Sequence, residues 1–236
     1  MIEFRPATLA DRDWVLSCTR AGGRLGCEYS FGNLFCYNAK YDIPIAETNG
    51  CFVSKCITPD ALYYTFPVGT GDRAAAVAEV LADAEHDGRP AYFYGMTADD
   101  KALMEREYGE RFDIQANRDA FDYVYAREDL QTLCGKKYQS KRNHISFFMR
   151  NNRWTYERIT NENKGECLEM SRLWLKQNEA DVRDEIEAEF KIITMAFQHF
   201  DALGFVGGLL RCDGRVVAYC MEIWRAASAI MPGSEP

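Results

Sequence analysis

The sequence predicts an α/β fold built around a mixed sheet. Segments typical of strands and helices alternate along both halves of the chain, as they do in proteins that layer helices on a sheet. Hydrophobic residues make up 47% and charged residues 27% of the 236 residues, which indicates a globular chain with a buried core. That length accommodates one large domain or two smaller ones.

The first half contains a complete set of alternating elements. The clearest is a helix at 72–86, where apolar side chains recur at i, i+3, i+4 and i+7 from Val77 and Gly88 follows as a stop. Thr97 is expected to cap a second helix. In order, we expect a strand at 2–5, helices at 11–20 and 29–37, strands at 50–57 and 61–66, the helix at 72–86, a strand at 91–96, a helix at 97–108 and a strand at 120–126.

The second half repeats the opening order of the first and then stops. Asp213-Gly214 between two strand-like runs is a strong hairpin signal. We therefore expect a complete domain at 1–126, a partial second domain at 127–224 and an unrelated tail at 225–236. The elements predicted here are helices at 129–150, 164–178 and 183–200, and strands at 154–159, 205–211 and 215–224.

Composition excludes several functional classes. A net charge of −8 argues against general nucleic-acid binding. The three histidines have no metal-ligand spacing and the nine cysteines form no C-x-x-C pair, so we expect no metal site and reduced thiols. There is no signal peptide, membrane-spanning run, nucleophile elbow or phosphate-binding Walker loop, which favours a cytoplasmic location and disfavours hydrolase chemistry.

A glycine-containing turn precedes the helix at 72–86 and is a candidate cofactor site. Gly69, Thr70 and Gly71 lie between a strand and this helix, where backbone N–H groups and the helix dipole can hold a phosphate. Asp72 would oppose that charge. The alternative is a tight turn in which Asp72 or Thr70 caps the helix. In either case, we expect a residue with positive φ or a close approach of two backbones.

A basic run at 135–150 is the second candidate site. On a helix, Lys137, Lys141 and His144 form a strip beside an apolar face. Arg142 projects close to that face and therefore needs a carboxylate or a phosphate as partner. Together with Asn143, these side chains predict an anion site. The alternative is a solvated helix face paired with the chain's many acidic residues.

Two further features are candidates for chemistry. Strand alternation places Glu222 on a face of small residues, where it either acts as a general base or simply reaches water. Tyr29 and Asn33 belong to an aromatic segment at helical spacing. That segment is either core or a wall of a ligand pocket.

Several of these segments together resemble the C-terminal family of phosphatidylglycerol lysyltransferase. The similarity spans nearly all of residues 1–224 and is most specific in the block around Lys141-Arg142-Asn143-His144. The resemblance implies tandem GNAT-like acyltransferase halves related to Fem-type transferases. It also implies transfer of an aminoacyl group from aminoacyl-tRNA to a lipid. The segments that carry it begin at Tyr29, Phe66, Asp122, Leu130 and Gly135.

In that family the second half continues past Glu222, and the blocks it carries there have no counterpart in this sequence. We therefore expect a truncated, catalytically incompetent chain whose exposed sheet edge permits self-association. The expected activity of the complete fold is acyl or aminoacyl transfer from aminoacyl-tRNA or a CoA thioester to an amine or hydroxyl. The alternative is a non-catalytic module that binds an anionic ligand, such as a phosphate, a tRNA acceptor end or a lipid headgroup.

Overall fold

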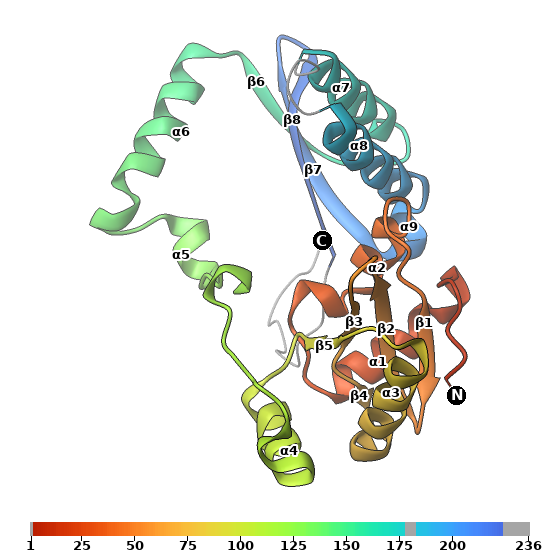
Figure 1. Ribbon diagram of the computed structural model, residues 1–236. Helices are drawn as coiled ribbons and strands as arrows, with labels where there is room; N and C mark the ends of the chain where they lie inside the picture. The colour runs from red at the N-terminus through yellow and green to blue at the C-terminus, as the bar shows by residue number, and fades with distance from the viewer. Residues whose placement is uncertain (1, 178–182, 224–236) are drawn as a thin grey trace. The chain divides into compact units, whose positions relative to one another are not determined.

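The computed structural model of the protein describes residues 2–177 and 183–223 (Figure 1). The described chain divides into two compact units. The first unit contains residues 2–116, 187–205 and Ile223, and the second contains 117–177, 183–186 and 206–222. The predicted domain boundary at residue 126 stays a prediction.

The first unit is built on a five-stranded mixed sheet. Its main order is β1-β2-β3-β5, with β4 paired to β2. β3 and β5 are parallel and the other pairs are antiparallel, which confirms the predicted α/β class with a mixed sheet. The strands are β1 (Ile45–Thr48), β2 (Cys51–Ile57), β3 (Leu62–Thr65), β4 (Val68–Gly69) and β5 (Ala91–Tyr94).

Helices cover both faces of this sheet. Val80 and Ala84 of α3 (Arg73–Asp87) pack in a buried cluster with Val53 and Tyr64. Trp14 contacts Phe52, which alternation places on the opposite face of β2. Trp14 belongs to α1 (Arg12–Ala21). The unit also contains α2 (Phe31–Tyr37), α4 (Ala98–Tyr108), α9 (Phe200–Leu203) and residues 187–198 of α8 (Arg183–Gln198).

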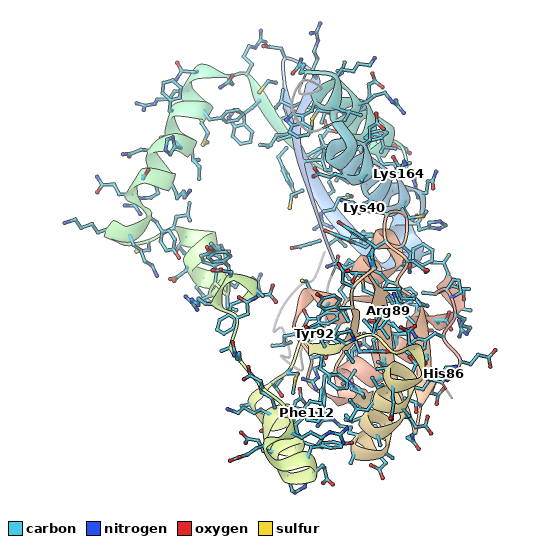
Figure 2. All side chains as sticks on the ribbon, in the orientation of Figure 1. Lys40, His86, Arg89, Tyr92, Phe112 and Lys164 are labelled. Atoms are coloured by element: carbon cyan, nitrogen blue, oxygen red, sulfur yellow. The ribbon has the colours of Figure 1, made fainter. Side chains whose placement is uncertain are left out.

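Side-chain caps fix where α3 and α4 begin, as the sequence predicts. The Asp72 carboxylate accepts a hydrogen bond from the backbone N–H of Ala75 at 3.0 Å. Thr97 and Asp100 cap α4 reciprocally, each side chain accepting from the other's backbone N–H. Gly88 ends α3 in the left-handed region at φ 85°. Arg89, which follows it, is labelled in Figure 2. It donates to Asp87 and to the carbonyl of Thr58.

The structure corrects the start of the predicted sheet. Residues 2–5 form no strand, and Arg5 makes only an isolated bridge to Ile45. β1 was not expected, although Asn49-Gly50 between β1 and β2 is a strong hairpin signal. Both residues have positive φ, at 50° and 72°, as a tight two-residue hairpin turn requires.

The second unit contains a three-stranded sheet in the order β6-β7-β8. β6 (Trp154–Arg158) runs antiparallel to β7 (Phe205–Cys212), and β7 is followed by β8 (Arg215–Ile223). The turn between β7 and β8 has positive φ at Asp213 and Gly214, so the predicted hairpin is confirmed. The helices are α5 (Arg127–Thr132), α6 (Gln139–Asn151), α7 (Lys164–Gln177) and the start of α8 (Arg183–Gln198).

One prediction for the chain after residue 116 was wrong, since no strand forms at 120–126. Residues 121–126 belong to no strand, and Tyr123 and Val124 are 89% and 90% exposed. Two predicted helical stretches are confirmed with other bounds. The stretch at 129–150 is helical except for a turn at Gly135, whose φ is 90°. The helix expected at 183–200 begins at Arg183 and ends at Gln198, and α9 follows it. The predicted tail at 225–236 lies outside the described residues.

Candidate functional site

The segment from residue 136 to 153 carries concentrated positive charge. It contains six cationic and no acidic side chains, whereas the whole chain has a net charge of −8. Most of the segment is α6, which follows α5 in Figure 1. A local excess of this kind attracts phosphate groups. The cations are Lys136, Lys137, Lys141, Arg142, Arg150 and Arg153.

Arg142 holds the turn between α5 and α6. Its Nη1 donates to the carbonyl oxygens of Leu133 and Gly135, the second at 2.9 Å. Leu133 adopts the left-handed conformation at the end of α5. The sequence suggested that Arg142 needs a carboxylate or a phosphate as partner. It does not, because backbone carbonyls already accept its hydrogen bonds.

Lys137 is also paired, but in solvent. Its Nζ lies 2.8 Å from the Asp129 carboxylate and 4.8 Å from the centre of the Tyr138 ring. The hydrogen bond raises the pKa of Lys137 and lowers the pKa of Asp129. Because both side chains are exposed, this ion pair contributes little to stability. An incoming phosphate can compete for Lys137.

Lys141 and Asn143 are the free members of the predicted set. Both are exposed, and within the described residues neither makes a side-chain hydrogen bond or an ion pair. Lys136 and His144 are also exposed, and their side chains likewise make no hydrogen bond or ion pair within the described residues. These four side chains are therefore available to an anionic ligand without breaking an existing contact.

The apolar side of α6 is also uncovered. Ile145 and Met149, one turn apart on this side, are 47% and 50% exposed. Phe147, on another side of the helix, is 65% exposed. A helix with cations beside an open apolar stripe suits a ligand that has both charged and apolar parts. The structure therefore places an open surface at the predicted anion site, accessible to a large ligand.

The Gly69–Gly71 turn packs against the hairpin that joins β1 and β2. A Cβ on Gly71 would lie 1.8 Å from the carbonyl oxygen of Asn49, and a Cβ on Gly69 would lie 2.4 Å from that of Gly50. The predicted close approach of two backbones is confirmed, and it accounts for both glycines. Thr70 is exposed. Cofactor binding by this turn stays a prediction.

The aromatic segment places its two candidate residues differently. Tyr29 is 1% exposed, and its hydroxyl donates to the carbonyls of Phe66 at 3.0 Å and Gly95 at 3.1 Å. Burial raises its pKa. Asn33 is half-buried and donates to the carbonyl of Cys27 at 3.3 Å. Tyr29 therefore has a packing role, and ligand binding by either residue stays a prediction.

Glu222 lies near the end of β8 and is exposed. Its neighbours on that face, Ala218 and Cys220, are exposed too, whereas Tyr219 and Met221 on the other face are half-buried. No described side chain hydrogen-bonds the Glu222 carboxylate. A role as general base stays a prediction.

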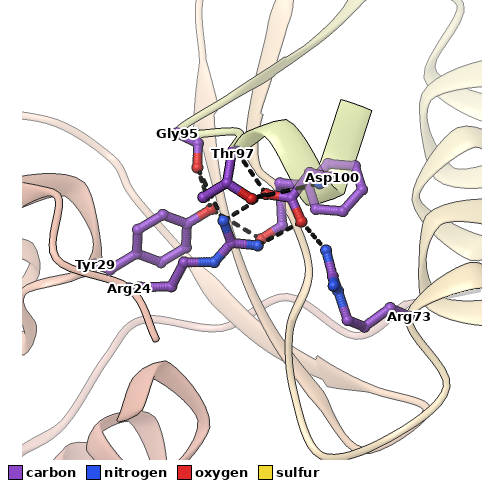
Figure 3. Close-up of polar contacts among 7 residues, drawn as sticks. Arg24, Tyr29, Arg73, Gly95, Thr97 and Asp100 are labelled. Carbon is purple, nitrogen blue, oxygen red and sulfur yellow. Dashed lines mark hydrogen bonds and ion pairs between the residues drawn. The ribbon is translucent and has the colours of Figure 1, made fainter. Parts of the chain in front are cut away.

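A buried ionic cluster in the first unit was not foreseen from the sequence. Arg24 contacts both oxygens of Asp100, with Nη2 at 2.7 Å from Oδ1, and Arg73 contacts Oδ1 as well (Figure 3). The Arg24 and Asp100 side chains are 3% and 0% exposed. The Thr97-x-x-Asp100 capping box can be recognised in the sequence, but nothing in the sequence indicates which cations contact Asp100.

The predicted site residues fall into both units. Lys137, Lys141, Arg142, Asn143 and Glu222 belong to the second unit, and Tyr29, Asn33 and the 69–71 turn belong to the first. Within the second unit, α6 and the turn before it bring the four basic-segment residues together.

The similarity to known proteins identifies the family. Residues 19–227 match the family described as phosphatidylglycerol lysyltransferase, C-terminal. The chain belongs to this family. None of the curated proteins matches it significantly.

Two solved structures resemble this member of the lysyltransferase C-terminal family. A conserved protein of unknown function from Bacteroides thetaiotaomicron is 35% identical and superposes with a TM-score of 0.86, covering 94% of this chain and 75% of that one. The DUF2156 C-terminal domain of a predicted lysylphosphatidylglycerol synthetase from Agrobacterium fabrum is 16% identical, with a TM-score of 0.53. That match covers 91% of this chain and 64% of the other, and shows similarity of fold. Among the described residues, no helix is long and apolar enough to cross a bilayer.

Proposed function

We propose that this protein takes part in acyl or aminoacyl transfer and that α6 holds the phosphates of the donor or the acceptor. Family membership supports aminoacyl transfer as the reaction class. The observation that carries the proposal is the exposed, unpaired state of Lys141 within a segment of six cations and no acidic residue. The donors that fit are aminoacyl-tRNA and a CoA thioester, because both carry phosphate groups in the same molecule as the reactive carbonyl.

The reaction forms one bond to the acyl carbon and breaks another. The amine or hydroxyl of the acceptor attacks the carbonyl carbon of the ester or thioester and loses a proton. The tetrahedral intermediate then expels the tRNA 3′-terminal ribose oxygen or the CoA sulfur, which takes up a proton. The protein's contribution to such a step is positioning and stabilisation of the oxyanion. Anchoring phosphates on α6 would fix the donor carbonyl relative to the acceptor.

Electrostatics favour a local site over general polyanion binding. A chain with a net charge of −8 repels nucleic acid over most of its surface, whereas α6 and its flanks attract it. The protein would therefore bind only the part of a tRNA or cofactor that reaches α6. The open apolar stripe of α6 also suits a lipid acceptor at a membrane surface, whose headgroup would meet the cations.

A transfer assay tests the proposal. The protein is incubated with radiolabelled lysyl-tRNA or acetyl-CoA together with amine and lipid acceptors, and the labelled product is separated from the donor. The proposal predicts transfer from one donor class above the rate without protein. It also predicts that Lys141→Glu reduces transfer while Lys176→Glu does not. Lys176 is exposed and lies on α7, outside the basic segment. If neither substitution changes the rate of transfer, α6 does not take part in the reaction.

A non-catalytic module that binds the same anions is the second candidate. The exposed position of Glu222 favours it, because no described residue hydrogen-bonds this carboxylate or desolvates it for proton transfer. This candidate predicts Lys141-dependent binding of aminoacyl-tRNA or CoA without transfer to any acceptor. Transfer by the parent protein therefore discriminates between the two candidates. Glu222→Gln then tests the base, since an enzyme that uses Glu222 would lose transfer while keeping its affinity for the donor.

A further inference from the structure

The buried cluster in the first unit contains more positive than negative charge. Two guanidinium groups, those of Arg24 and Arg73, meet the single carboxylate of Asp100 (Figure 3). Each arginine also stacks on an aromatic ring, Arg24 at 5.2 Å from the centre of Tyr29 and Arg73 at 5.3 Å from that of Phe66. The three ionic groups together carry one excess positive charge.

Arg73 is not required to neutralise Asp100. Arg24 already binds both carboxylate oxygens, and Thr97 donates to Oδ2 from its backbone N–H at 2.8 Å and from its hydroxyl at 3.0 Å. The Arg73 contact with Oδ1 is an ion pair without hydrogen-bond geometry. A second, partly buried cation beside Arg24 costs desolvation and repulsion. Both effects lower the pKa of Arg73, and burial lowers it more than the repulsion from Arg24 does.

Hydrogen-bond donors in the cluster are left over. Among the described residues, Nε of Arg24 and Nε of Arg73 are buried and donate to no acceptor. Buried donors of this kind are rare in folded proteins and point to a missing acceptor. The Arg73 side chain is 27% exposed, so a ligand can approach it from solvent, whereas Arg24 is enclosed.

We infer that Arg73 is the primary contact of a second anion site, in the first unit, that takes a phosphoryl group. A phosphate offers the charge and the several acceptor oxygens that a guanidinium binds well. The site adjoins the Gly69–Gly71 turn, whose neighbour Asp72 has its carboxylate bound to the N–H of Ala75. The inference is independent of acyl transfer and of α6, because Lys141 belongs to the other unit.

The experiment measures thermal unfolding of the full chain in sodium pyrophosphate, in sodium phosphate and in sodium acetate at matched ionic strength. The variants are Arg73→Gln, Arg73→Lys and Lys141→Glu. The control is Arg106→Gln, which removes an exposed arginine of α4. A phosphoryl site predicts a saturable rise in Tm with pyrophosphate or phosphate and none with acetate. Affinity should fall about tenfold or more in Arg73→Gln, less in Arg73→Lys, and stay unchanged in Arg106→Gln.

Stability without ligand separates binding from packing. Because Arg24 alone satisfies Asp100, Arg73→Gln should unfold at a Tm equal to or above that of the parent in phosphate-free buffer. A large loss of Tm there would show that Arg73 is structural and would overturn the inference. The inference would also be overturned by absence of a saturable shift in the parent, an equal shift in acetate, or an undiminished shift in Arg73→Gln. If Lys141→Glu alone abolished the shift, the phosphate would bind at α6, which supports the proposed function and contradicts this site.

Discussion

Arg24 and Asp100 bind each other through paired contacts in the interior of the first unit, although 76 residues separate them in the sequence. This pair ties the segment after α1 to the first turn of α4. Because Asp100 also belongs to the capping box of α4, one buried carboxylate supports both a helix start and a long-range contact.

Asp100→Asn should therefore be strongly destabilising. The substitution leaves the buried guanidinium of Arg24 and the partly buried one of Arg73 without a counter-charge, and breaking a buried ion pair in this way costs about 3–5 kcal/mol. Asp99→Asn is the matched control, because Asp99 is the exposed neighbour on the same turn. Urea unfolding of both variants measures the difference. Equal free energies of unfolding in the two variants would refute the assigned role of Asp100.

Gly71→Ala and Gly165→Ala should shift stability in opposite directions. A Cβ at Gly71 would lie 1.8 Å from the Asn49 carbonyl oxygen, so the hairpin backbone must move, at a cost above about 1 kcal/mol. Gly165 lies in α7 with open space around its Cβ position, so alanine should gain up to about 1 kcal/mol through helix propensity. Chemical denaturation checks both signs, and a neutral Gly71→Ala would mean that the turn yields easily.

Asp11 should make the first unit sensitive to acid. Its carboxylate accepts from Arg5 at 2.8 and 2.5 Å, and from the N–H and hydroxyl of Thr8 at 2.8 Å each. The Arg5 hydrogen bond, followed by those from Thr8, holds the pKa of Asp11 well below its ordinary value. Because the pKa of Asp11 is lower in the folded than in the unfolded state, its ionisation stabilises the folded state. This stabilisation is fully present above the unfolded-state pKa, about 3.9, and is lost as the pH falls below that value.

The corresponding measurement compares the parent with Asp11→Asn. We expect a gap of about 1–2 kcal/mol in unfolding free energy at pH 7, as for loss of a helix cap. The gap should narrow as pH falls from about 4 to 2. Asp13→Asn removes a carboxylate whose side chain is 91% exposed and should have little effect at any of these pH values. A gap that is independent of pH would contradict the assigned role of the ionised carboxylate.

Local signals in the sequence predicted much of the fold. The cap residues Asp72 and Thr97, the stop at Gly88 and the hairpin at Asp213-Gly214 act within a few residues, so their physics is contained in the local sequence. β1 was missed because its own residues are few, although the Asn-Gly turn that follows it was visible.

Features that depend on distant partners were harder to predict. Residues 121–126 have the aromatic and β-branched composition of a strand, but a strand needs a neighbour, and Tyr123 and Val124 have none in the described structure. The partners of Arg24 are likewise set by tertiary structure. At the candidate site, the sequence located the basic segment but did not show that Arg142 is bound by backbone carbonyls while Lys141 is free.

Hydrogen exchange should show the difference between 121–126 and the sheet. The segment is exposed and belongs to no described strand ladder, so its amides should exchange rapidly. Amides of β2, which pairs with β1, β3 and β4, should exchange slowly. Peptides spanning 121–126 and 51–57 can be followed by mass spectrometry in one experiment. Protection of 121–126 comparable to that of β2 would mean that this segment pairs in solution.

The salt dependence of donor binding tests most directly the proposal that exposed cations of α6 hold a phosphate-bearing substrate. Fluorescence anisotropy with labelled lysyl-tRNA and a labelled CoA thioester, between about 50 and 200 mM salt, gives Kd and its salt slope for the parent, Lys141→Glu and Lys176→Glu. We expect one ligand to bind the parent with an affinity that falls as the salt concentration rises. Its affinity for Lys141→Glu should be about tenfold lower, with a shallower salt slope, and its affinity for Lys176→Glu should equal that for the parent. Equal affinities and slopes in all three proteins would contradict the proposal.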